Sequence, residues 1–361
     1  MMSEILSFAQ LMEKVDAIDP ITYAQTRNFI NGSVTKLSPY ISRGTLSTNQ
    51  VASRLFQNGY SMKVLEPLLK ELLWRDYFQR LGQVYSREWD TPMENEIPAF
   101  LLDASSQVYA VDQCIKDLEL SGYMHNHVRM YLASITLNVA KHNYNGPAKW
   151  LFYHLLDGDF ASNTASWLWV NGDRGKKKYW VNQENINYYT HSFQVDSFLN
   201  LSYEELPEIT SPKHLEKMMV WQPNVKLPKT DDLLLDKNLD YLFYTPYNLD
   251  PNWHVSETFN RILWLQPSYF KRWPCSDNVM RFILANARQI VGLQVFVGEL
   301  EDLKLVMQSE RKWLMKEHPL FKFDAFEYEE RDWIVPALVG EFPSFFNYWN
   351  KASKHLAQYE K

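Results

Sequence analysis

The chain has 361 residues, of which 46% are hydrophobic, 15% aromatic and 22% charged. This composition excludes a disordered protein, a collagen-like fibre and a small disulfide-stapled domain, and the length is sufficient for two domains. The formal net charge of -6 gives no overall attraction to nucleic acid or anionic lipid, although a local basic patch still permits DNA contact.

The chain has only two cysteines, too few for a disulfide framework or a cysteine-only metal cluster. The N-terminus lacks the basic segment and apolar run of a secretory signal, and no stretch approaches the roughly 20 apolar residues of a membrane helix. We therefore expect a soluble, cytoplasmic protein with no metal site.

The first two-thirds of the chain shows helical patterns. Ser47 and Gln50 have the spacing of a capping box, which predicts a helix that ends near Asn58. Leucines at helical spacing predict a helix from Lys63 to about Leu81. Two further helices are predicted over residues 126–142 and 149–156.

The pattern changes after about residue 203, where four prolines interrupt a stretch with little periodicity. Residues 261–265 and 293–297 are predicted to be buried strands, with a helix over 277–290 between them. This βαβ order favours a parallel pair with a right-handed crossover. Residues 321–326 alternate like a third strand, and residues 342–357 form an aromatic-rich helix.

These elements predict a mainly α-helical domain followed by a smaller α/β module. We place the helical domain at residues 1–205, a connecting segment at 206–240 and the α/β module at 241–361.

Two motifs in the helical part carry polar groups in unusual arrangements. Thr35-Lys-Leu-Ser-Pro39 is a hydroxyl-rich turn that enters a helix, so it either holds a phosphate or is a plain N-cap. Glu71, Trp74, Arg75 and Phe78 share one helix face. That face is either functional or an amphipathic surface with an intrahelical Glu71–Arg75 ion pair.

Two more motifs follow. In Met124-His-Asn-His-Val-Arg-Met130, the histidines are more readily explained as structural or solvated side chains than as metal ligands. Asp157-Gly-Asp159 is followed by Asn163, Trp167 and Trp169, without the regular ligands of an EF-hand. The two acids either cap a helix, pair with Arg129 or bind the hydroxyls of a cofactor.

The densest basic run, residues 174–180, is interleaved with aromatic residues. A charge run of this kind is usually a solvated loop. Because Trp167 and Trp169 precede it closely, contact with DNA phosphates is the alternative.

Taken together, these motifs resemble the FAD-binding domain of the DNA photolyase/cryptochrome family. The resemblance spans roughly residues 23–189 and rests on the order and intervals of Tyr23 and Arg27, TKLSP, ELLWR, MHNHVRM, and DGDFASN leading to WLW.

The resemblance implies a helical domain that holds FAD in a folded form. It implies that the following residues contact the cofactor: Tyr23, Thr35, Lys36, Leu37, Ser38, Pro39, Arg75, Arg129, Asp157, Asp159 and Asn163. Within this set, it implies that Arg129 pairs with Asp157 and that Asn163 faces flavin N5.

The resemblance is strongest to enzymes that repair cyclobutane pyrimidine dimers in DNA. It implies a substrate wall formed by Arg27, Glu71, Trp74, Asn126, Met130 and Trp169. It further implies catalytic roles for Glu71, Asn163 and Trp167, and an electron relay to the flavin through Trp167 and Tyr144. Such an enzyme flips the dimer out of the duplex, and reduced flavin excited by light transfers an electron to it.

Two departures from the family pattern bear on function. Family members normally carry an N-terminal α/β domain, whereas here the flavin domain starts almost at Met1 and the α/β segment follows it. Ala104 to Asp112 replace the usual glycine- and threonine-rich segment. A cryptochrome-like photoreceptor with a protein partner on the C-terminal module is therefore the second hypothesis. A non-catalytic scaffold or nucleic-acid-binding protein is the third.

Overall fold

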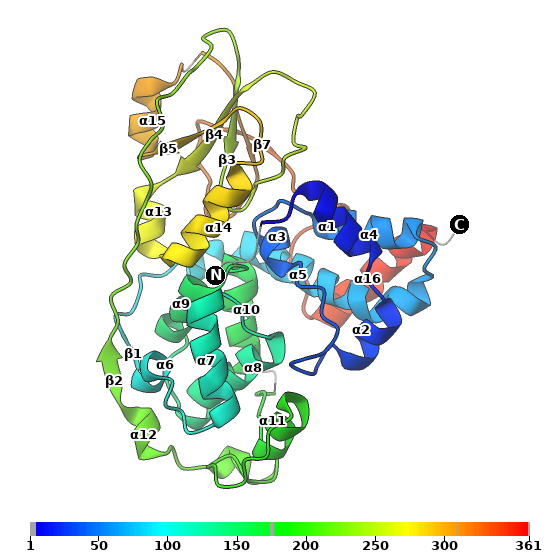
Figure 1. Ribbon diagram of the computed structural model, residues 1–361, viewed down its shortest axis with the longest axis vertical. Helices are drawn as coiled ribbons and strands as arrows, with labels where there is room; N and C mark the ends of the chain where they lie inside the picture. Colours follow the sequence, from blue (N-terminus) through cyan, green and yellow to red (C-terminus); the bar gives the residue numbers. More distant parts are fainter. Residues whose placement is uncertain (1–4, 174–176, 309, 360–361) are drawn as a thin grey trace.

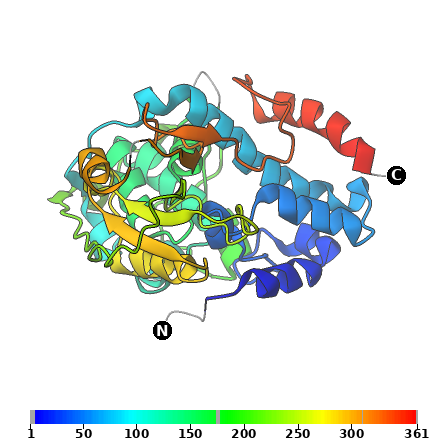
Figure 2. The same ribbon diagram turned by 90° about the horizontal axis from the view of Figure 1, so that it is seen from above.

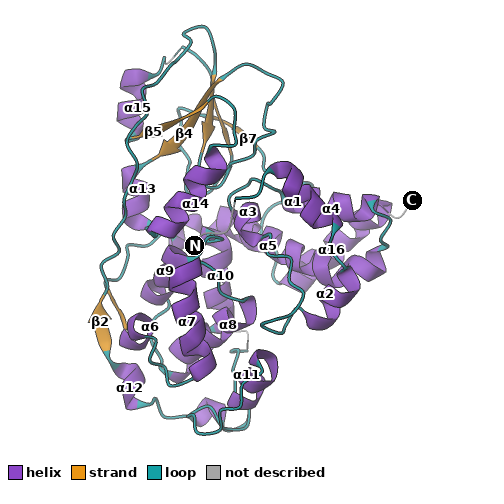
Figure 3. Ribbon diagram, viewed as in Figure 1, coloured by secondary structure: helices purple, strands orange, loops and turns teal. Residues whose placement is uncertain are grey.

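The computed structural model describes residues 5–173, 177–308 and 310–359. The parallel β-sheet lies at one end of the long axis, and the helices occupy the other end and one side of the molecule (Figures 1 and 3). Among the described residues, no helix combines the length and the apolar character needed to cross a membrane. The predicted fold class, a helical domain with a smaller α/β module, is confirmed.

The helical half is built from eleven α-helices of the described residues. They are α1 (Phe8–Asp16), α2 (Pro20–Thr26), α3 (Ser38–Ser42), α4 (Thr48–Gln57), α5 (Met62–Trp89), α6 (Ala99–Asp103), α7 (Tyr109–Ser121), α8 (Asn126–Ser134), α9 (Asn145–His154), α10 (Phe160–Val170) and α11 (Gln183–Thr190). The predicted capping box is present, because Ser47 accepts a hydrogen bond from the Gln50 backbone while the Gln50 side chain binds the Ser47 backbone.

Three predicted helices have different bounds. Helix α5 continues eight residues beyond the predicted end, because its polar later turns still bury Leu81, Gly82 and Trp89. Helix α9 starts earlier, at Asn145. Helix α8 ends at Ser134 and continues as a π-helical turn, Ile135–Val139, in which Thr136 donates its hydroxyl to the carbonyl of Leu132.

The connecting segment lies along both halves of the molecule. It contains a short 3₁₀ turn (Leu206–Glu208), α12 (Lys213–Glu216) and β2 (Met218–Val220), which pairs antiparallel with β1 (Glu96–Pro98). Further on, the backbone amide of Asp231 donates to the carbonyl of Val295, so the segment continues along the edge of the sheet. The bounds of the connecting segment, 206–240, stay a prediction.

Five parallel strands form the sheet in the order β5-β4-β3-β6-β7. They are β3 (Tyr241–Tyr244), β4 (Asn260–Leu265), β5 (Leu293–Val297), β6 (Trp313–Lys316) and β7 (Glu327–Glu329). Helices α13 (Pro267–Arg272), α14 (Asp277–Ala287) and α15 (Leu300–Val306) complete the module. Every residue of β3 and β4 is buried, as expected for central parallel strands. The predicted βαβ unit, β4–α14–β5, is confirmed.

The strand predicted over residues 321–326 is wrong, because these residues form a loop before β7. Their apolar alternation has another cause: the rings of Phe321, Phe323 and Phe326 all pack around Trp264 of β4. A loop that covers the end of a sheet can therefore show the same period as a strand.

The C-terminal helix α16 (Phe345–Leu356) begins at its cap, Ser344, and lies against α5, away from the sheet (Figures 1 and 2). Its buried residues Phe345, Tyr348 and Trp349 join a core that includes α1, α4 and α5. The predicted domain boundaries stay a prediction, but this helix packs on the helical half.

Candidate flavin site

Four segments that are distant in sequence meet at the candidate site: residues 35–43, the middle of α5, the start of α8 and the turn before α10. Arg75 on α5 donates to the Ser42 hydroxyl (Nη2 to Oγ, 2.5 Å), and that hydroxyl donates to the carbonyl of Asp157 (2.7 Å). Arg129 on α8 donates to the carboxylate of Asp157 (Nη2 to Oδ2, 3.0 Å). Asp157 therefore connects all four segments.

Asp157 is ionised in spite of its burial. Burial opposes ionisation, but the guanidinium of Arg129 outweighs this effect and holds the pKa of Asp157 below its usual value. The carboxylate oxygen Oδ1 is also buried and has no hydrogen-bond partner among the described residues. An unpaired buried oxygen costs free energy, so this atom is suited to accept a hydrogen bond from a ligand.

The turn at residues 35–39 carries two hydroxyl groups beside the site: that of Thr35 accepts the backbone amide of Leu37 (3.4 Å), and a hydrogen bond from Ser38 helps to lower the pKa of Asp157. Leu37 and Pro39 are buried and fix the turn in the core, whereas Thr35 and Ser38 are half-buried. No side chain caps α3, so the plain N-cap alternative does not describe this turn. Lys36 is exposed and has a φ of 53°, a left-handed conformation that costs free energy for a residue other than glycine.

Asp159 caps a helix and lies close to the candidate site. Its Oδ1 accepts the backbone amide of Ser162 at 2.8 Å and thereby caps α10, as one of the alternatives proposed. Burial acts to raise its pKa, but the nearby Arg75 lowers it below the usual value. The Asp159 carboxylate also accepts a hydrogen bond from Gln79 (3.3 Å).

Asn163 and Trp167 follow on one face of α10, and both are buried. The Asn163 amide donates to the carbonyl of Ala148 on α9 (2.9 Å), so the side chain is fixed in one orientation. Trp167 lies in the core of the helical half, and Tyr144 is half-buried at the start of α9. The relay role of these two rings stays a prediction.

A second polar group, Glu71 and Arg27, lies at the partly exposed edge of the candidate site, here called the rim. Glu71 forms an ion pair with Arg27 of the turn after α2, instead of the intrahelical pair with Arg75. Both side chains remain about one-third exposed (34% and 31%). Tyr23 is buried beside this pair, and burial raises the pKa of its hydroxyl, which therefore stays a hydrogen-bond donor.

The start of α8 is attached to the same rim by two histidines. His125 bonds the carbonyl of Arg27 (3.1 Å) and His127 bonds that of Asn28 (2.9 Å), so both have the structural role expected. Burial lowers the pKa of His125 to about 4, which keeps the ring neutral. Asn126 is exposed and Met130 half-buried on this helix, and the amide of Asn126 contacts the sulfur of Met130 (3.8 Å).

Trp74 has a partner that the sequence did not predict. Its ring stacks in parallel on Phe345 of α16, with centroids 3.9 Å apart and an interplanar angle of 11°. Trp169 contacts Tyr179 (5.6 Å) instead, near the basic run. Residues 174–176 of that run lie outside the described residues, and its contact with DNA stays a prediction.

The donor set fits FAD. The free Oδ1 of Asp157 can accept a ribityl or ribose hydroxyl, and the half-buried hydroxyls of Thr35 and Ser38 can donate to the pyrophosphate. Arg75 and Arg129 supply positive charge beside the same turn. No metal is needed for these contacts.

A family model supports this assignment: residues 68–241 match the model described as the FAD binding domain of DNA photolyase. The chain carries the FAD-binding domain of the photolyase/cryptochrome family. FAD is therefore its cofactor. The matched region includes all the candidate residues from Glu71 to Trp169, whereas Tyr23, Arg27 and the turn at 35–39 precede it.

Several known proteins are similar. A deoxyribodipyrimidine photo-lyase of Vibrio cholerae is 29% identical over 163 residues, which are 41% of this chain and 35% of that protein. A cryptochrome DASH of Danio rerio is 26% identical over 193 residues, covering 46% and 36%. A solved Synechocystis cryptochrome has 24% identity and a TM-score of 0.46, covering 52% and 44%. The chain thus spans about a third of the length of these two curated relatives.

Some residues of the site were not found from the sequence. Ser42 joins Arg75 to the carbonyl of Asp157, and Gln79 bonds Asp159. Gln79 lies four residues after Arg75, about one helical turn. The spacing of residues on this face of α5 could therefore have predicted that Gln79 lies beside Arg75. Ser42 gave no comparable signal.

Proposed function

We propose that this protein is an FAD-dependent, light-driven lyase that repairs cyclobutane pyrimidine dimers in DNA. The observation that carries the proposal is the solvent-accessible rim formed by Glu71, Arg27 and Asn126, next to the segments that fit FAD. A flipped-out dimer has carbonyl and N–H groups, and this rim provides an acceptor, donors and an amide to bind them.

Bound FAD supplies the photochemistry, because its reduced, excited form donates the electron that starts cleavage of the dimer. The chain's own residues bind and orient the cofactor and the dimer. The Arg27 guanidinium holds the Glu71 carboxylate at the rim, where it can accept an N–H of the dimer. Asn163 is fixed by Ala148 and keeps a polar amide beside the proposed flavin position.

The substrate wall proposed from the sequence divides into two parts. Glu71, Arg27, Asn126 and Met130 retain exposed surface at the rim. One face of the half-buried Trp74 stacks on Phe345, so only the remaining surface of its ring is available to a dimer. We therefore propose that Glu71 and Asn126 make the main contacts with the dimer, and that Trp74 stabilises the α5–α16 interface.

A blue-light photoreceptor is the second candidate. The observation in its favour is that several relatives are named cryptochromes. In that case, light-driven flavin reduction would alter a surface that binds a protein partner, for which the C-terminal module is the proposed location.

The test is a repair assay on the purified protein with reduced flavin. A thymine-dimer oligonucleotide, single-stranded or duplex, is illuminated beside a dark control. The proposal predicts thymine restored only in the light, and the strand comparison defines the substrate. Bound FAD without repair of either substrate would contradict the lyase proposal and favour the photoreceptor.

A further inference from the structure

A hollow in the surface of the helical half lies where α8 and α10 end. The π-helical turn Ile135–Val139, the residues that follow Val170, and Pro207 of the connecting segment form its walls. The ion pair of Arg129 and Asp157 lies near the starts of the same two helices, so the hollow is separate from the candidate flavin site. Its volume of about 740 Å³ is in the range of small-molecule sites.

Asn138 forms the floor of this hollow and carries an unpaired acceptor. The residue is 1% exposed. Its Nδ2 donates to the carbonyls of Tyr179 (2.7 Å) and Val170 (3.2 Å), and since both partners are acceptors, the orientation of the amide is determined. The buried Oδ1 has no donor among the described residues. An unpaired buried acceptor costs free energy, so this atom indicates a ligand with an N–H or O–H group.

The backbone around the floor has an unusual conformation. Lys141, just after the π-helical turn, has a φ of 60°, which costs free energy for a residue other than glycine. Two hydrogen bonds hold the next residue, His142: its amide donates to the carbonyl of Thr136 (3.0 Å), and its ring Nε2 to that of Leu215 (2.7 Å). Because π-helical turns and strained residues are frequent at functional sites, this conformation supports a binding role.

Three lysines give the mouth of the hollow a positive charge. Lys141, Lys177 and Lys178 are exposed and line it, whereas no acidic residue of the described chain does. None of the three has an ion-pair partner within the part of the chain that the structure describes. In a protein with a net charge of -6, such an unbalanced cluster favours an anion, and phosphate oxygens accept strong hydrogen bonds from lysine.

The remaining feature of the lining is an aromatic ring. Trp180 is half-buried, so by exposure it comes between the buried Asn138 and the exposed lysines. A ligand that fits this order has a donor at one end, a flat ring and an anionic group at the other end. A nucleotide has all three. The phosphodiester backbone of a DNA strand has no donor, so phosphates on the lysines alone would leave Asn138 unpaired.

We propose that this hollow binds a mononucleotide. Its phosphate contacts Lys141, Lys177 and Lys178, its base stacks on Trp180, and an N–H or hydroxyl group of the nucleotide donates to Oδ1 of Asn138. The proposal goes beyond the proposed lyase function and does not depend on it, because none of these contacts involves the flavin or a dimer.

The experiment is calorimetric titration of the FAD-loaded protein at neutral pH with AMP. Adenosine lacks the phosphate and ribose 5-phosphate lacks the base, so we expect each to bind about tenfold more weakly than AMP. No binding of AMP, or equal affinity for AMP and ribose 5-phosphate, would overturn the proposal. Displacement of AMP by an oligothymidylate without terminal phosphates would also overturn it, because the occupant would then be a nucleic acid strand.

A charge-removing variant assigns the binding to this hollow. Replacing Lys141, Lys177 and Lys178 together by asparagine removes the positive charge at the mouth, and asparagine tolerates the φ of residue 141. All three side chains are exposed, so we expect the protein to fold and its affinity for AMP to fall by about tenfold. The matched control replaces three exposed lysines elsewhere by asparagine: Lys63, Lys229 and Lys237. Equal affinities of the two variants would contradict the proposed site.

A second variant tests the stacking. Trp180→Leu keeps an apolar side chain but removes the flat ring, so we expect the affinity for AMP to fall by about tenfold and that for ribose 5-phosphate to stay unchanged. This difference separates stacking from a general loss of structure, which would weaken both ligands. Unchanged affinity for AMP would contradict the contact with the base. If the variant does not fold, the lysine variant still tests the site.

Discussion

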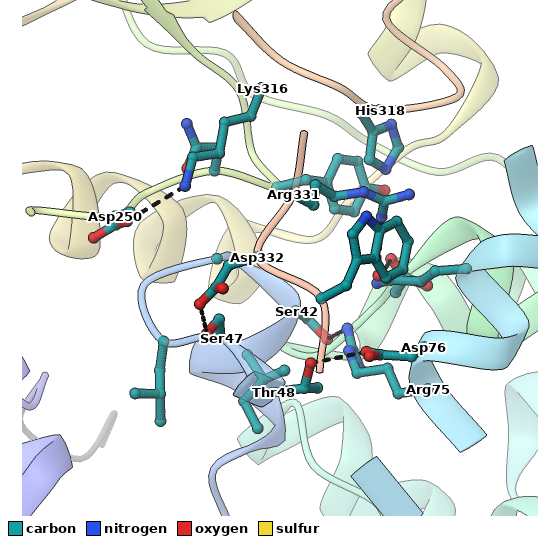
Figure 4. A pocket seen from close by; sticks show the side chains of 18 of the residues that line it. Ser42, Ser47, Thr48, Arg75, Asp76, Asp250, Lys316, His318, Arg331 and Asp332 are labelled. Atoms are coloured by element: carbon teal, nitrogen blue, oxygen red, sulfur yellow. Dashed lines mark hydrogen bonds and ion pairs between the residues drawn. The ribbon is translucent and has the colours of Figure 1, made fainter. Parts of the chain in front are cut away.

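The two halves of the molecule assemble their polar sites differently. In the helical half, the candidate flavin residues come from short motifs whose members are close in sequence, such as Glu71 and Arg75 on one face of α5. In the α/β half, Asn248, His318 and Arg331 are far apart in sequence, yet they line one cleft between the two halves, because parallel strands end at one edge of the sheet (Figure 4). The first kind of site can be found from sequence motifs, whereas the second depends on strand order.

The halves also differ in how they are held together. Helix α16 follows the sheet in sequence and yet packs on α5, while Asp76 on α5 accepts the amide of Ile334 from the C-terminal segment. The residues after β7 therefore attach the α/β module to the helical half. Substitutions at this attachment and in the flavin site test how the two halves are held together.

The largest effect is expected for Phe345→Ala. This ring is 2% exposed and stacks on Trp74, so its removal leaves a cavity between α16 and α5. We expect a loss of about 3–5 kcal/mol in the free energy of unfolding, measured by urea denaturation. Phe346→Ala, at the neighbouring position with 63% exposure, is the control and should change stability by less than about 0.5 kcal/mol. Equal effects would show that α16 is not packed as described.

The next effect is expected for Arg129→Leu. The change leaves the buried carboxylate of Asp157 without its ion-pair partner, and the partly exposed arginine limits the loss to about 2–3 kcal/mol. We also expect loss of FAD, measured as flavin absorbance after gel filtration. Lys304→Leu breaks an exposed ion pair with Glu301 and should affect neither quantity. Full FAD occupancy in Arg129→Leu would remove this pair from the flavin site.

A smaller effect is expected for Gly82→Ala, which tests the contact between α5 and α10. An added Cβ would lie 2.5 Å from the Cβ of Ala161, so one of the two helices must shift. We expect a loss of about 1–3 kcal/mol in urea denaturation. The double variant Gly82→Ala, Ala161→Gly restores the space and should recover most of the loss. An additive loss in the double variant would contradict the close contact.

The smallest effect is expected for His254→Asn in the α/β half. Although burial opposes protonation, hydrogen bonds from the ring to Glu257 and Glu329 raise the pKa of His254 above its usual value. A raised histidine pKa contributes stability below the unfolded-state pKa, and this contribution is lost as the pH rises through the folded-state pKa. Asparagine tolerates the φ of 49° at this position.

The check compares urea denaturation of wild type and His254→Asn at pH 5.5 and pH 9. We expect the variant to be less stable than the wild type at the lower pH, with a smaller difference at the higher pH. A difference that does not change with pH would mean that the histidine is not protonated in the folded protein.

Much of the fold could be predicted because local rules decide it. The Ser47–Gln50 capping box determines the start of α4, and the continuous apolar runs at 261–265 and 293–297 correspond to buried parallel strands. The wrong predictions concern segments whose secondary structure is determined by tertiary contacts. The phenylalanines at 321–326 pack around Trp264 from a loop, and the polar end of α5 stays helical because α10 packs on Gly82.

For the site, the motifs predicted which segments come together, and the ion pair of Arg129 with Asp157 is present. They did not predict that Phe345, more than 270 residues later, stacks on Trp74. Nor did they predict the cleft between the two halves, because its lining residues come from segments that are far apart in sequence. The roles of individual residues toward FAD and DNA stay predictions.

The most direct test of the proposed function is the light-dependent repair yield of Glu71→Gln with reduced FAD. Glutamine keeps the size of the side chain but loses the charge that binds Arg27 and the dimer, so we predict a yield about tenfold lower with FAD still bound. Glu66→Gln, on the same helix and paired with Lys70, is the matched control and should repair normally. Unchanged repair by Glu71→Gln, or no repair by the wild-type protein in the light, would contradict the account.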